Sequence, residues 1–199
     1  MPHRYFILHK PYNMVSQFIS PHHVRLLGHL GIEWPAGIHA VGRLDNHSEG
    51  LLILTTNKKL THLLFEAETP HNRTYWVQVN GEVGDEALQQ LKNGVEFTIK
   101  NGTKYNAIPV DVKIIAEPSY AKTPPYFISN KINYTWLSLT LAEGKYHQVR
   151  KMMSAIHHRC RRLIRVSIED LQLGNLQPGD YQEIAEDEMF RLLKIKPVS

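Results

Sequence analysis

The chain has 199 residues, of which 42% are hydrophobic and 21% are charged, and its net charge is +4. This length and composition suit one domain or two lobes around a sizeable hydrophobic core, and they exclude global disorder and a membrane-spanning helix. The single cysteine, Cys160, excludes an internal disulfide, and with a start unlike a signal peptide it favours a cytoplasmic location.

The first third of the chain is expected to contain two strands and two helices. The β-rich run 4–8 stops at a Lys-Pro pair and predicts a strand, and 24–30 predicts a short helix. The apolar run 51–55 predicts a buried strand. The next segment, 57–68, has leucines on one face and begins at Asn57, which is typical of a helix with an asparagine N-cap.

The middle of the chain alternates between strands and one short helix. Strands are expected over 74–79, 110–115 and 136–141, and a helix over 85–94 ends at a glycine. The segment 117–136 is rich in proline and tyrosine and is expected to be a long, functional loop.

The last third begins with a helix and ends in strands. Apolar residues at 149, 152, 153 and 156 follow helical spacing, and 161–168 and 181–184 predict strands. Strands outnumber helices, and their connections are too irregular for repeated βαβ units. The fold class is therefore expected to be α+β, with a mixed, mainly antiparallel sheet flanked by helices.

Basic residues are concentrated in one part of the sequence. Positions 145–165 contain seven Lys or Arg and no acid, and positions 1–32 contain no Asp or Glu. Such a one-sided field suits the phosphates of RNA or DNA, and the alternative is a solvated basic helix face. The seven residues are Lys145, Arg150, Lys151, Arg159, Arg161, Arg162 and Arg165.

One acid stands out in the stretch VGRLDNHSEGLL at 41–52. Asp45 lies in a polar turn before the apolar strand, where it can satisfy backbone NH groups or act as a catalytic carboxylate. A catalytic carboxylate in a dry cleft needs a cation that keeps it ionised. Arg43, two residues away, can face the same way and hold Asp45, or reach past it toward a phosphate or a base.

Two further residues each have a structural and a functional interpretation. Arg150 follows the inward-facing Val149, so it can reach a buried carboxylate or simply extend its charged end to solvent. Tyr75 alternates with two valines and can belong to the core, or it can stack on a nucleobase and offer its hydroxyl to a proton transfer.

Five ordered motifs cover nearly the whole chain. They are Lys-Pro-x-x-x-x-Ser at 10–16, Gly-Arg-Leu-Asp-x-x-Ser-Glu-Gly-Leu-Leu at 42–52, Arg-x-Tyr-x-Val at 73–77, Glu-Gly-x-x-x-Gln-Val-Arg-Lys-Met at 143–152, and Leu-x-Arg with Leu-x-x-Leu-x-x-Gly at 163–179. This set resembles the pseudouridine synthases of the RsuA/RluB/RluE/RluF group, which act on ribosomal RNA.

The resemblance implies a role for several residues. Asp45 would be the catalytic aspartate, Arg150 its salt-bridge partner, Tyr75 the residue that packs on the target uracil and serves as the final base, and Arg43 the residue that fills the gap left by the flipped nucleotide. It also implies no cofactor and no metal. The other candidates for RNA contact are Lys10, Lys145, Lys151, Arg161, Arg162 and Arg165.

The resemblance also implies an architecture and a substrate. Residues 1–199 are expected to form a single catalytic domain whose two lobes flank a cleft, where Asp45, Tyr75 and Arg150 converge. Lys10 lies too near the start for a preceding S4-type RNA-binding domain, which favours the E-type subgroup that acts on large-subunit (23S) ribosomal RNA. The departures Asn46 and Lys-Tyr-His at 145–147 concern RNA contacts more than chemistry.

The expected protein is thus a monomeric isomerase, an RNA pseudouridine synthase with ribosomal RNA as its partner. The alternatives are a synthase for small-subunit ribosomal RNA or transfer RNA, and a non-catalytic RNA-binding protein on the same scaffold. The segment HHRC at 157–160 does not indicate a metal site, because it has no second cysteine and no spaced acidic or histidine partner.

Overall fold

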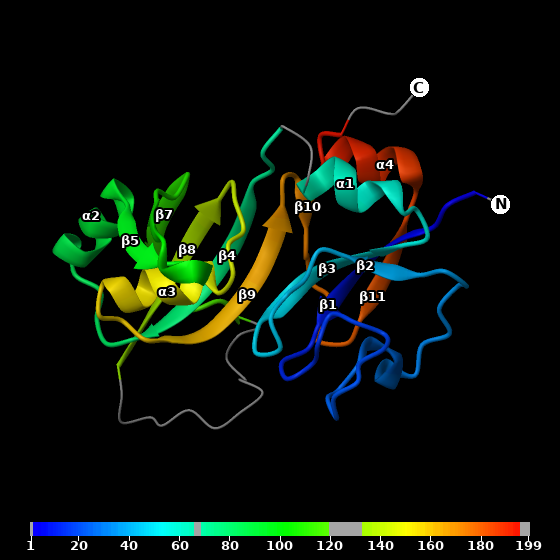
Figure 1. The fold of residues 1–199 in the computed structure, drawn as a ribbon, viewed down its shortest axis with the longest axis horizontal. Coiled ribbons are helices and arrows are strands. Elements are labelled where there is room, and N and C mark those ends of the chain that lie inside the picture. Colours follow the sequence, from blue (N-terminus) through cyan, green and yellow to red (C-terminus); the bar gives the residue numbers. More distant parts are fainter. Residues whose placement is uncertain (1, 66–68, 120–132, 196–199) are drawn as a thin grey trace. The chain divides into compact units, whose positions relative to one another are not determined.

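The computed structural model describes residues 2–65, 69–119 and 133–195. The chain divides into two compact units. The first unit contains Met1–His71 and Ile164–Ser199, and the second contains Asn72–Leu163. In Figure 1 the first unit includes the blue and the orange-to-red parts of the ribbon, and the second includes the green and yellow parts. The second unit is therefore an insertion in the sequence of the first.

The first unit is built around strand β3, all of whose residues are buried. Strand β1 pairs antiparallel with one edge of β3, and β11 pairs antiparallel with the other edge of β1. The second edge of β3 is shared, because β2 pairs with residues 53–55 and β9 pairs in parallel with residues 49–50. The strands of this unit are β1 (Tyr5–Lys10), β2 (His39–Val41), β3 (Glu49–Thr55), β9 (Cys160–Ile168, from Ile164), β10 (Leu171–Gln172) and β11 (Tyr181–Ile184).

Short helices complete the core of the first unit. They are η1 (Leu27–Leu30, a 3-10 helix), α1 (Lys59–Phe65) and α4 (Glu186–Leu192). Helix α1 buries Leu60 and Leu64, and α4 buries Met189. The Asn57 side chain accepts a hydrogen bond from the backbone N of Lys59 (3.0 Å), which confirms the predicted cap at the start of α1.

The second unit contains an antiparallel sheet with β8 at its centre. Strand β4 pairs with one edge of β8 and β7 with the other. Strands β5 and β6 form a separate antiparallel hairpin. The strands of this unit are β4 (Arg73–Asn80), β5 (Val95–Thr98), β6 (Lys104–Ala107), β7 (Asp111–Ile115), β8 (Tyr134–Leu141) and the first residues of β9.

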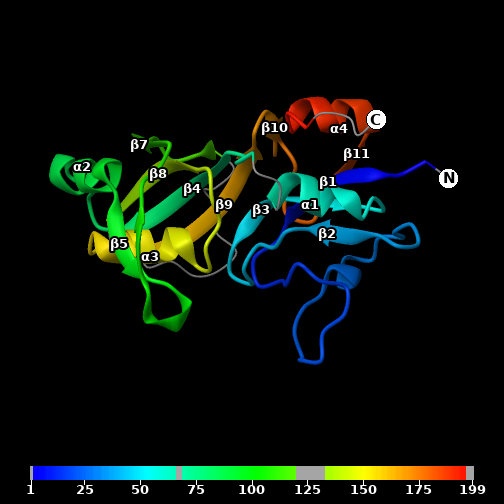
Figure 2. The same cartoon turned by 45° about the horizontal axis from the view of Figure 1, so that its top comes forward.

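Helix α3 packs against both the sheet and the hairpin of the second unit. It buries Val149, Met152 and Met153 in a core that also contains residues of β4, β5 and β8. Figure 1 and Figure 2 both show α3 beside β5. The helices of this unit are α2 (Asp85–Asn93), η2 (Lys100–Gly102, a 3-10 helix) and α3 (Gln148–Ala155).

The structure confirms the predicted α+β class with a mixed, mainly antiparallel sheet, and it corrects several details. Only residues 27–30 of the predicted helix 24–30 are helical, and residues 134–136 of the predicted loop belong to β8. Most of that loop, 120–132, lies outside the described residues. The hairpin β5–β6, the short strands β2 and β10, and helix α4 were not predicted. Across 2–65, 69–119 and 133–195, no helix is long and apolar enough to span a membrane.

Candidate active site

The loop between β2 and β3 carries Asp45. Its carbonyl oxygen accepts a hydrogen bond from the backbone N of Ser48 (3.0 Å), which closes a tight turn. Leu44 is buried, whereas Arg43 is exposed and Asp45 is partly exposed. This alternation agrees with the prediction that Arg43 and Asp45 face the same way in an extended segment. The acid therefore lies at the edge of a buried strand with access to solvent.

Ser16 fixes the residue immediately before Asp45. Its hydroxyl accepts a hydrogen bond from the backbone N of Leu44 (3.0 Å) and donates one to the carbonyl oxygen of Leu44 (3.0 Å). Ser16 is 5% exposed, so water does not compete freely with these bonds. The serine of the Lys-Pro-x-x-x-x-Ser motif thus holds the backbone of the Asp45 loop.

Lys10 connects the same motif to the residue after Asp45. Its ammonium group donates hydrogen bonds to the carbonyl oxygens of Met14 (2.5 Å) and Pro11 (2.9 Å), with a longer contact to that of Asn46 (3.5 Å). The backbone N of Met14 also donates to the Asn46 carbonyl (3.2 Å). Ser16 and Lys10 therefore hold the backbone on the two sides of Asp45.

The pKa of Lys10 is set by its burial and by its charged neighbours. Burial lowers its pKa to about 7, although the carboxylates of Glu49 and Asp45 act in the opposite direction, and the Arg165 guanidinium lowers it further. Lys10 has no exposed surface and Glu49 is 1% exposed. Lys10 therefore interacts electrostatically with Asp45 as well as with Glu49 and Arg165.

Gly50, in the motif at 42–52, occupies a position where a side chain would not fit. It has φ of +105°, and a Cβ atom there would lie 2.2 Å from the carbonyl oxygen of Arg165 on β9. The Arg165 side chain also donates a hydrogen bond from Nε to the carbonyl oxygen of Leu51 (2.8 Å). A glycine at this position lets β9 approach β3 closely and sets where the Asp45 loop rejoins the sheet.

Tyr75 belongs to the second unit. It lies on β4 opposite Leu139 of β8, and its partly buried ring packs against the hydrophobic core of that unit. This placement accommodates both interpretations of the sequence, since the side chain packs against the core but is not fully buried.

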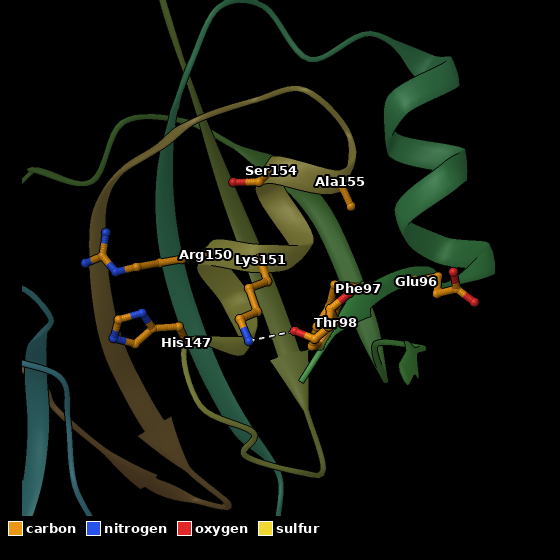
Figure 3. Close-up of a pocket in the computed structure, with 8 residues that line it drawn as sticks. All are labelled: Glu96, Phe97, Thr98, His147, Arg150, Lys151, Ser154 and Ala155. Atoms are coloured by element: carbon orange, nitrogen blue, oxygen red, sulfur yellow. Dashed lines mark hydrogen bonds between the residues drawn. The ribbon is translucent and has the colours of Figure 1, made fainter. Parts of the chain in front are cut away.

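Arg150 is on α3 of the second unit. Its side chain is partly exposed, and one guanidinium nitrogen lies 3.8 Å from Sγ of Cys160. Burial raises the pKa of the Cys160 thiol to about 11, and the Arg150 charge opposes this shift. Figure 3 shows Arg150 and Lys151 leaving α3 in different directions. The expected meeting of Arg150 and Tyr75 with Asp45 joins the two units and stays a prediction.

The candidate residues for RNA contact differ in how exposed their side chains are. Arg43 and Lys145 are exposed, and Lys151 and Arg161 are partly exposed. Three others are buried, with exposed fractions of 0% for Lys10, 2% for Arg162 and 3% for Arg165. Direct contact with RNA does not fit these three side chains, because they lie inside the first unit or along the buried strand β9.

Sequence reasoning assigned no role to Ser16 or Glu49, although both lie within quoted motifs. A signal was present, because a serine and an acid at fixed positions beside a lysine and an aspartate suggest a polar network. No group of three or more His, Cys, Asp or Glu side chains in the described part of the chain could hold a metal ion.

The chain is similar to known proteins of one family. Residues 4–155 match the family described as RNA pseudouridylate synthase. The chain is 37% identical over 180 residues to a protein of Vibrio parahaemolyticus named "Ribosomal large subunit pseudouridine synthase E", which covers 89% of this chain and 72% of that protein. A protein of the same name from Xanthomonas axonopodis pv. citri is 37% identical over 176 residues, which covers 86% of this chain and 89% of that protein.

Solved structures give the same fold. A structure described as "Crystal structure of pseudouridylate synthase" superposes with a TM-score of 0.73 at 24% identity, and the match covers 96% of this chain and 74% of that one. The motifs, the α+β fold and the match over residues 4–155 lead to one conclusion. The chain belongs to the RNA pseudouridylate synthase family and is an isomerase of that family.

Proposed function

We propose that this protein converts a uridine of large-subunit (23S) ribosomal RNA to pseudouridine in the cytoplasm, and that it acts as a monomer. The substrate proposal rests on the 37% identity to relatives named as synthases of the large ribosomal subunit. The catalytic proposal rests on the Asp45 loop, whose backbone is held on one side by Ser16 and on the other by Lys10.

The reaction rearranges the nucleotide without adding or removing any group. The bond from C1′ of the ribose to N1 of uracil breaks, the uracil rotates, and C1′ bonds to C5. The hydrogen of C5 leaves as a proton, and N1 gains one. The target base must leave the RNA stack, and the site must keep water from the detached uracil.

In the proposed mechanism Asp45 acts on the ribose. Its carboxylate either attacks C1′ or removes a proton from the sugar on the route to a glycal. Both routes require a carboxylate at a fixed position, and the turn at Ser48 and the bonds to the neighbouring backbone support that position. Arg165 provides positive charge in the same unit, and Lys10 adds to it when it is protonated, below its pKa of about 7.

The roles of three other residues complete the proposal. Arg150 forms the salt bridge that orients Asp45, and Tyr75 packs on the uracil and accepts the C5 proton. The exposed Arg43 enters the RNA helix where the flipped nucleotide was. The partly exposed ring of Tyr75 supports the stacking role, because a base needs an accessible aromatic face.

A second RNA is a specific alternative. The chain is 30% identical to a Yersinia pestis protein named "Ribosomal small subunit pseudouridine synthase A", over 94% of this chain and 72% of that protein. The lower identity places this substrate second, and an assay with both RNAs distinguishes them.

The test is the release of tritium from RNA transcribed with 5-tritiated uridine. Bond formation at C5 expels this hydrogen, so its appearance in water reports the chemistry directly. Wild type and Asp45→Asn are compared on large-subunit and small-subunit RNA. We expect release from large-subunit RNA by wild type and a loss of at least about 1000-fold in the variant.

Each other outcome contradicts a defined part of the proposal. Equal release by wild type and Asp45→Asn would remove Asp45 from the mechanism. Release only from small-subunit RNA would overturn the substrate. Absence of release from either RNA, with RNA binding intact, would favour a binding protein on this scaffold.

A further inference from the structure

An exposed tyrosine lies next to the start of helix α3. Tyr146 is 60% exposed, so much of its side chain is open to solvent. Its ring stacks on that of His147, with centroids 3.9 Å apart and an interplanar angle of 15°. His147 has φ of +54°, in the left-handed region. The stack is thus part of the turn that leads into α3.

Lysines approach this ring from two separate elements. Nζ of Lys100, on η2, and Nζ of Lys151, on α3, each lie 5.8 Å from the centroid of the Tyr146 ring. Lys151 is held in place, because Nζ donates a hydrogen bond to the carbonyl oxygen of Thr98 (2.8 Å), as Figure 3 shows. Lys145 adds a third cation, with Nζ 5.2 Å from the centroid of the Tyr105 ring.

The nearby acids are engaged elsewhere. Glu96 forms an ion pair with Lys104 (2.7 Å). Glu143 accepts hydrogen bonds from Gln148 (2.7 Å) and from the hydroxyl of Tyr105. Glu143 keeps its negative charge, because both of its donors are neutral, but the three lysines outnumber it and the surface around Tyr146 stays positive.

An open cavity of about 430 Å³ lies between α3 and β5. Lys151 and His147 line it, and so does Arg150, the proposed partner of Asp45. Figure 3 shows these side chains on the same helix end. The cavity therefore connects the Tyr146 surface to a residue of the proposed active site within one unit.

We propose that Tyr146 and His147 form a stacking platform for an unpaired nucleotide that flanks the target uridine, with Lys100, Lys145 and Lys151 contacting the adjoining phosphates. Single-stranded RNA is bound by this combination of an accessible aromatic face with cations along the backbone. The inference rests on the proposed function, because it names an RNA subsite of the same enzyme.

The test compares Tyr146→Ala with Tyr146→Phe. Fluorescence anisotropy measures the Kd for a labelled single-stranded RNA of about 12 nucleotides taken from the substrate. We expect Tyr146→Ala to weaken binding about 10-fold and Tyr146→Phe to bind like wild type, because stacking requires the ring and not the hydroxyl. In the tritium assay Tyr146→Ala should raise KM by a similar factor and leave kcat within about twofold.

Two lysine variants test whether the lysines contact phosphates. Lys100→Ala should lower the slope of log Kd against log salt by about 0.7, the value for one phosphate on a single strand. Lys113→Ala is the matched control, since Lys113 is an exposed lysine on β7 of the same unit, and it should leave the slope unchanged.

Two results would overturn the inference. One is identical Kd and KM values for Tyr146→Ala and Tyr146→Phe, and the other is an equal loss of slope in Lys100→Ala and Lys113→Ala. Failure of the proposed function gives a different result. Wild type would then release no tritium, while the Kd values of Tyr146→Ala and Tyr146→Phe could still be compared.

Discussion

The replacement of Lys10 by methionine tests the network that holds the Asp45 loop. Methionine has a similar length and shape but no ammonium group, so the carbonyl oxygens of Pro11, Met14 and Asn46 lose a donor. We expect kcat to fall about 10- to 100-fold, because the backbone beside Asp45 is no longer fixed.

The pH dependence of stability supplies a second, independent magnitude. Burial lowers the pKa of Lys10 from 10.5 in its ordinary state to about 7 in the folded protein. The folded state therefore releases this proton at a lower pH than the unfolded chain. Its contribution to the free energy of unfolding is fully present above pH 10.5 and is lost as the pH falls through about 7. The gap between the two values corresponds to about 5 kcal/mol.

Urea unfolding of wild type and Lys10→Met between pH about 6 and about 10 measures this term. Relative to the variant, wild type should gain about 1 kcal/mol by pH about 8 and about 4 kcal/mol by pH about 10. Lys113→Met, at an exposed lysine, should show no such gain. If the difference in the free energy of unfolding between wild type and Lys10→Met does not change with pH, the lowered pKa of Lys10 is refuted. Wild-type turnover by Lys10→Met would refute its role in holding the loop.

Three further predictions concern buried groups. Ser16→Ala removes both hydrogen bonds to Leu44, so the free energy of unfolding should fall by about 1–3 kcal/mol, measured in urea, and an unchanged value would contradict the role of the hydroxyl. Gly50→Ala should lower the midpoint of thermal unfolding by several degrees at least, because the new Cβ meets the backbone of β9. This corresponds to a loss of about 3 kcal/mol in the free energy of unfolding. The control Gly28→Ala, where the new Cβ has open space around it, should match wild type. The Cys160 thiol should not react with a disulfide reagent at pH about 8 until urea unfolds the chain, because burial raises its pKa to about 11, and rapid labelling of the folded protein would contradict this.

The sequence predicted the parts of the site that have local causes. Polar turn residues followed by an apolar run indicated a loop entering a buried strand, and this agrees with Asp45 before β3. The caps at Asn57 and Gly94 were predicted because each acts on adjacent backbone. The motif order then identified the family without information on contacts.

Burial of basic residues could not be predicted from local pattern. Lys10 and Arg165 become buried through pairing between β1, β3 and β9, which are far apart in sequence. The hairpin β5–β6 was missed because its strands have four residues each and its stability comes from α3 and the core of the second unit. Helix α4 was missed because it has seven residues and buries only Met189 and Phe190, although the carboxylates of Glu186, Asp187 and Glu188 stabilise its N-terminus.

The discontinuous first unit has a consequence for synthesis on the ribosome. Residues 72–163 are contiguous, so the second unit can acquire its core as soon as they have emerged. The loop with Asp45 and its partners Ser16 and Lys10 are made earlier, but the sheet beside them is completed later, because β9 pairs with β3 and β11 pairs with β1 only after residues 164–184 have been made. A nascent chain that stops before Tyr181 would contain the complete second unit, including Tyr146 and its lysines, while β1 still lacked one of its two neighbouring strands.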